Sequence, residues 1–121
     1  MNQEHMLAKI LDGDIELIDT YSNKYDRYNS ECKILITPQQ IAKILADYLN
    51  KKLNPMELQK WADFLCHNDA LYTPRHEGED YYEDMWHVLQ KISTPFIDGE
   101  INVNNISEYL TELNNKYKMS C

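Results

Sequence analysis

Apolar residues recur at helical spacing in two neighbouring segments near the middle of the chain. One segment starts at Thr37-Pro38 and the other at Asn54-Pro55, and each has Gln or Glu at the third helical position. A capping residue followed by proline and then Gln or Glu is the signature of a helix start. The stripes that follow contain Ile41, Ile44, Leu45, Tyr48 and Leu49 in the first segment, and Leu58, Trp61, Ala62, Phe64 and Leu65 in the second. The pattern predicts two helices that form an antiparallel hairpin, because only a few residues join them.

Two more helices are predicted in the C-terminal half. One ends before Thr94-Pro95, because the residue before a proline is pushed out of the helical region. After a turn at Gly99, the last helix is expected to begin near Asn102. The two stripes are Met85, Val88, Leu89 and Ile92, and then Ile106, Tyr109, Leu110, Leu113 and Tyr117.

The first 36 residues have a less regular pattern. Leu7, Ile10 and Leu11 predict a short helix that Asp12-Gly13-Asp14 interrupts. A second stripe consists of Ile18, Tyr21, Tyr25 and Tyr28, and its three tyrosines are interpreted as core residues. Residues 34–36 are an apolar run that predicts a short extended segment without an obvious sheet partner. We therefore predict an all-α fold: residues 1–121 as a single compact bundle of about five or six helices.

Charge and cysteine usage restrict the class of protein. The 121 residues carry a formal net charge of −8, which argues against nucleic-acid binding, because phosphate recognition needs a cationic surface. No apolar run approaches the ~20 residues that span a bilayer, and the N-terminus lacks the features of a signal peptide. The three cysteines are widely spaced without a C-x-x-C motif, and Cys66 is interpreted as a core residue. These features favour a soluble, cytoplasmic protein in a reducing compartment.

The acidic charge is concentrated in residues 67–100. This segment contains eight carboxylates against Arg75 and Lys91, a net charge of −6. Tyrosines occur in the same segment, and tyrosine beside carboxylates is typical of a surface that receives a basic protein partner. The alternative is an ordinary solvated face. The candidate partner-binding residues are Tyr72, Glu77, Glu79, Asp80, Tyr81, Tyr82, Glu83 and Asp84.

Metal binding and catalysis are weaker alternatives. His67, His76 and His87 occur among carboxylates, but Asp84-Met85-Trp86-His87 approximates only one half of a helical di-metal motif. Cys66 and His67 are adjacent, which points their side chains about 100° apart on a helix. The chain has no G-x-S-x-G motif and no glycine-rich phosphate loop. We therefore assign no catalytic residue, no metal ligand and no cofactor.

The central and C-terminal segments together resemble a known family. Four groups of residues carry the likeness: Ile36-Thr37-Pro38-Gln39-Gln40-Ile41; Leu58, Trp61, Ala62 and Leu65; Ile92-Ser93-Thr94-Pro95; and Ile106-Ser107-Glu108-Tyr109-Leu110. In this pattern the chain resembles small bacterial immunity proteins of the contact-dependent growth inhibition and polymorphic-toxin type. The likeness covers roughly residues 34–114. It implies a protein that is not an enzyme and that binds the C-terminal domain of one cognate toxin, often a nuclease.

The leading hypothesis is therefore an immunity protein that occludes the cationic active site of its toxin. We expect such a protein to make no direct contact with nucleic acid or with a membrane. One alternative is a helical adaptor or regulatory domain that binds a basic or amphipathic protein. Another alternative is a metal-dependent hydrolase built on the histidines and nearby carboxylates.

Overall fold

Seven helices and two short strands make up the part of the chain that the computed structural model describes, residues 2–25, 34–68, 71–72 and 82–118. The helices are α1 (Gln3–Leu11), α2 (Glu16–Lys24), α3 (Pro38–Leu49), α4 (Pro55–Cys66), α5 (Glu83–Ser93), α6 (Pro95–Asp98) and α7 (Val103–Tyr117), and the strands are β1 (Ile34–Leu35) and β2 (Leu71–Tyr72). The predicted all-α class is confirmed, with one helix more than the sequence pattern indicated.

The capping residues start three helices as predicted. The Gln40 backbone N–H donates to Oγ1 of Thr37, and Oε1 of Gln40 accepts the Thr37 N–H at 2.9 Å. Asn54 and Glu57 make the same reciprocal pair at the start of α4. Asn102 caps α7 by accepting the Asn105 N–H at 2.8 Å. Each cap satisfies donors that the first helical turn leaves without an intrahelical partner.

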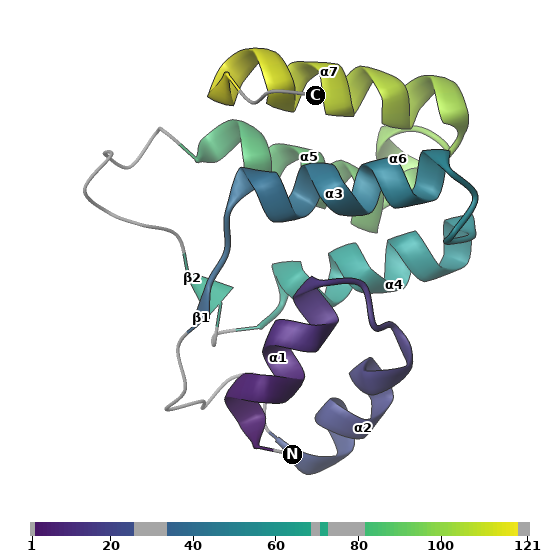
Figure 1. Ribbon diagram of the computed structural model, residues 1–121. Coiled ribbons are helices and arrows are strands. Elements are labelled where there is room, and N and C mark those ends of the chain that lie inside the picture. Colours follow the sequence, from purple (N-terminus) through teal and green to yellow (C-terminus); the bar gives the residue numbers. More distant parts are fainter. Residues whose placement is uncertain (1, 26–33, 69–70, 73–81, 119–121) are drawn as a thin grey trace.

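The helices stack in layers (Figure 1), with α7 above α3 and α5, α4 below them, and α1 with α2 at the other side of α4. α3 and α4 run in opposite directions, as the hairpin prediction requires. Each nevertheless packs most extensively on another helix. α3 packs on α7, which is distant in sequence, and α4 packs on α5, the next helix along the chain. The core thus depends on contacts between the two halves of the chain. In the described part of the chain, no helix is both long and apolar enough to cross a membrane.

Trp61 of α4 belongs to this core, as predicted. Its side chain is fully buried, and its indole N–H donates to the carbonyl oxygen of Ile10 at 2.8 Å. Tyr21 of α2 is also fully buried and packs edge-on against Phe64. The core interpretation of Tyr21 is therefore confirmed, and Tyr25 packs partly buried against the same cluster. Tyr28 lies outside the described residues.

The end of α2 and the additional helix α6 differ from the sequence prediction, whereas the predicted end of α5 at Thr94-Pro95 is confirmed. α2 ends at Lys24, and Tyr25 has extended backbone angles, because Ser22 and Asn23 have low helix propensity and favour helix ends. Thr94-Pro95 ends α5 but also begins α6. Proline is compatible with the first turn of a helix, where its missing N–H would have no partner.

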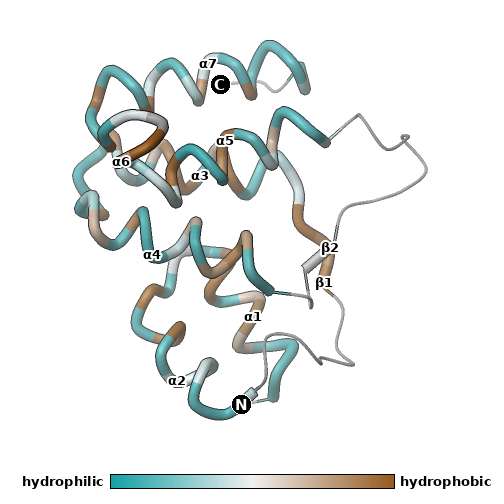
Figure 2. Tube along the Cα trace, turned by 180° about the vertical axis from the view of Figure 1, so that it is seen from behind, coloured by the Kyte–Doolittle hydropathy of each residue, from teal (hydrophilic) through white to brown (hydrophobic). Residues whose placement is uncertain are grey.

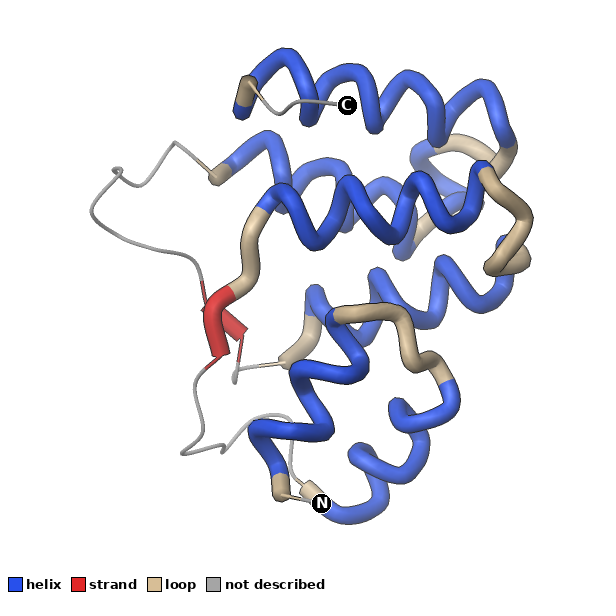
Figure 3. The backbone as a smooth tube through the Cα atoms, viewed as in Figure 1, coloured by secondary structure: helices blue, strands red, loops and turns tan. Residues whose placement is uncertain are grey.

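The apolar run at residues 34–36 has a sheet partner that the sequence pattern did not identify. β1 pairs in parallel with β2, Ile34 opposite Leu71 and Leu35 opposite Tyr72. Figure 3 shows this pair beside the layers of helices. Parallel pairing requires a long crossover, and here the crossover contains α3 and α4. The strand pair therefore ties the segment before α3 to the segment after α4.

Candidate functional site

The structure describes only part of the predicted partner-binding set. Glu77, Glu79, Asp80 and Tyr81 lie outside the described residues. The backbone of Tyr72 is placed by β2, opposite Leu35 of β1. The described side chains of the set are those of Tyr82, Glu83 and Asp84, which all lie where α5 begins.

Glu83 and Asp84 form an exposed acidic turn at the start of α5. Their side chains are 57% and 54% exposed. Glu83 lies 3.7 Å from Nε2 of His87, and Asp84 lies 3.7 Å from Nζ of Lys116 on α7. Carboxylates in a first helical turn interact favourably with the helix dipole, which orders them without a strong partner. Exposed ion pairs contribute at most about 1 kcal/mol to stability. A cation that binds these carboxylates more tightly can therefore displace His87 or Lys116.

Tyr82 does not share this exposure. It is only 9% exposed, and its ring stacks on Tyr117 with centroids 6.0 Å apart. The hydroxyl of Tyr117 accepts the backbone N–H of Met85 at 3.2 Å. The two tyrosines thus attach the start of α5 to the end of α7. Tyr82 supports the acidic turn from inside the protein and offers little ring surface to a partner.

Of the three histidines considered as metal ligands, the structure describes His67 and His87, and each lies near one carboxylate on its own helix. Nδ1 of His67 lies 3.3 Å from Asp63 on α4, and His87 pairs with Glu83 on α5. Among the described residues, no group of three His, Cys, Asp or Glu side chains is arranged to hold a metal ion. His76 lies outside the described residues.

Cys66 packs half-buried against the core at the end of α4. Burial raises the pKa of its thiol to about 11, although a hydrogen bond with Ser93 opposes this shift. A thiol with a raised pKa is a poor nucleophile at neutral pH. The core interpretation of Cys66 is confirmed in part.

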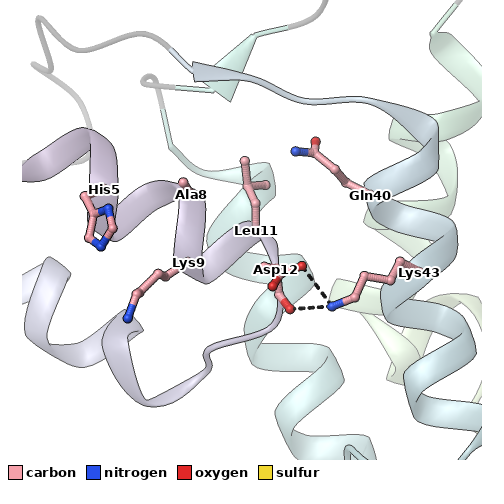
Figure 4. Close-up of a pocket in the computed structure, with 7 residues that line it drawn as sticks. All are labelled: His5, Ala8, Lys9, Leu11, Asp12, Gln40 and Lys43. Carbon is pink, nitrogen blue, oxygen red and sulfur yellow. Dashed lines mark hydrogen bonds and ion pairs between the residues drawn. The ribbon is translucent and has the colours of Figure 1, made fainter.

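A groove between α1 and α3 was not indicated by the sequence. It has a volume of about 320 Å³ and is lined by His5, Ala8, Lys9, Leu11, Asp12, Gln40 and Lys43 (Figure 4). Lys43 donates to the Asp12 carbonyl at 2.8 Å and pairs with the Asp12 carboxylate at 2.9 Å. The Asp12 hydrogen bond raises the pKa of Lys43. Lys43 therefore connects α3 to the end of α1, and its ammonium group is already occupied.

A set of exposed apolar side chains, which we name the apolar end, was also not indicated by the sequence pattern. It consists of Met56, Phe96, Ile97 and Val103, whose exposed fractions lie between 60% and 81%. Val103 also lines a groove of about 410 Å³ beside Tyr48, Leu49, Leu53 and Pro55. The sequence offered one signal of this exposure: Phe96 and Ile97 are large apolar residues that directly follow a proline and belong to no predicted helical stripe.

Comparison with protein-family models, with curated proteins and with solved structures finds no match to this chain.

Proposed function

We propose that the chain is an immunity-type inhibitor that binds a cationic toxin domain and blocks its active site. The observation that carries this proposal is the uneven charge, with eight carboxylates against two basic residues in residues 67–100 of a chain whose net charge is −8. A nuclease active site is cationic because it must hold phosphates. A dense acidic surface competes for the same Lys and Arg side chains.

The acidic turn of α5 supports the proposal by its accessibility. Glu83 and Asp84 are more than half exposed, and their partners lie at the 3.7 Å outer range of ion pairing. Replacing His87 or Lys116 by a cation of the toxin as the partner of these carboxylates therefore costs little free energy. The turn is also held in place, because Tyr82 and Tyr117 stack directly beneath it. An ordered acidic surface needs less side-chain ordering when it binds.

The mechanism is occlusion with electrostatic steering. Long-range attraction between an acidic inhibitor and a cationic cleft accelerates encounter. Once docked, the carboxylates occupy the positions at which substrate phosphates would bind. The inhibitor performs no chemistry in this mechanism.

The test uses the toxin domain encoded beside this chain, because the resemblance implies that the two genes are neighbours. The binding variant combines Glu83→Gln and Asp84→Asn, and the control combines Glu4→Gln and Glu16→Gln. The control residues are also exposed acidic groups in first helical turns, and they remove the same charge. Asp12 and Asp19 are less suitable controls, since they pair with Lys43 and Lys60.

We expect the binding variant to lose affinity at least about 30-fold, because a toxin cation buried without its partner costs about 2 kcal/mol or more. Association should also become slower and less sensitive to salt. Its free energy of unfolding should stay within about 0.5 kcal/mol of the wild type, as for other exposed pairs. Equal affinity of the two variants would show that the acidic turn is only a solvated face.

A further inference from the structure

We draw no further inference here: the strongest candidate, the exposed apolar end formed by α6, the start of α4 and the start of α7 (Figure 2), carries nothing, because nothing in the part of the chain that the structure describes shows what covers it.

Discussion

Two side chains hold the C-terminal end of α1 with hydrogen bonds of equal length and very different surroundings. The indole N–H of Trp61 donates to the Ile10 carbonyl at 2.8 Å inside the core. The ammonium group of Lys43 donates to the Asp12 carbonyl at 2.8 Å at the rim of the groove in Figure 4. The Ile10 carbonyl also accepts the backbone N–H of Gly13 at 2.9 Å, and Asp12 is the residue that caps α1.

The two contacts differ in their access to solvent. Water cannot replace Trp61, whose side chain is fully buried, so its loss removes apolar contacts and leaves a cavity. Water can replace Lys43, whose side chain is 49% exposed. Bond length is thus a poor guide to stability, and burial decides the difference.

The largest effect is expected for Trp61→Ala. Loss of the buried ring should lower the free energy of unfolding by about 3–5 kcal/mol, measured by urea denaturation. Trp61→Phe retains much of the apolar surface and should cost less. A midpoint of unfolding that Trp61→Ala leaves unchanged would contradict the central position of this side chain.

Cys66 provides a case of intermediate burial. Its thiol pKa is raised to about 11 from an ordinary value near 9, so the folded protein keeps a proton that the unfolded chain loses between pH 9 and pH 11. The contribution of the protonated thiol to the free energy of unfolding is fully present below pH 9 and is lost as the pH rises toward 11. We expect the stability of the wild type relative to Cys66→Ala to fall by about 1–2 kcal/mol, after allowance for solvent at the partly exposed thiol.

Denaturation curves of the two proteins at several pH values measure this difference. The lysines and tyrosines titrate in both proteins, so their effects cancel. A stability difference that does not vary with pH would contradict the burial of the thiol.

The smallest effect is expected for Lys43→Met. The change removes the bond to Asp12 but keeps most of the aliphatic stem, so the loss should be about 0.5–1 kcal/mol. The loss should shrink at high salt, because ions screen exposed charges. The cost of Trp61→Ala should show no such decrease, and this contrast separates the two contacts most directly.

The proposed site could be predicted from sequence only in part. The exposure of Glu83 follows from its position opposite the apolar stripe of α5, which is a local property, whereas Asp84 lies at the edge of that stripe. The burial of Tyr82 depends on Tyr117, which lies in a different helix. The apolar end has a local signal only at Phe96-Ile97, because its other residues come from α4 and α7.

The sequence by itself determined the starts of α3, α4 and α7. Their caps join residues only three positions apart, so the hydrogen bonds form within one turn whatever the rest of the chain does. It also determined which faces are buried, since apolar residues at helical spacing must leave water together.

Tertiary structure alone decided the partners of these elements. β1 pairs with β2 across α3 and α4, and Trp61 reaches the Ile10 carbonyl from 51 positions along the chain. Apolar burial is non-directional, so a stripe specifies that a helix packs but not on which helix. The choice of α7 for α3 and of α5 for α4 follows from packing the whole chain at once.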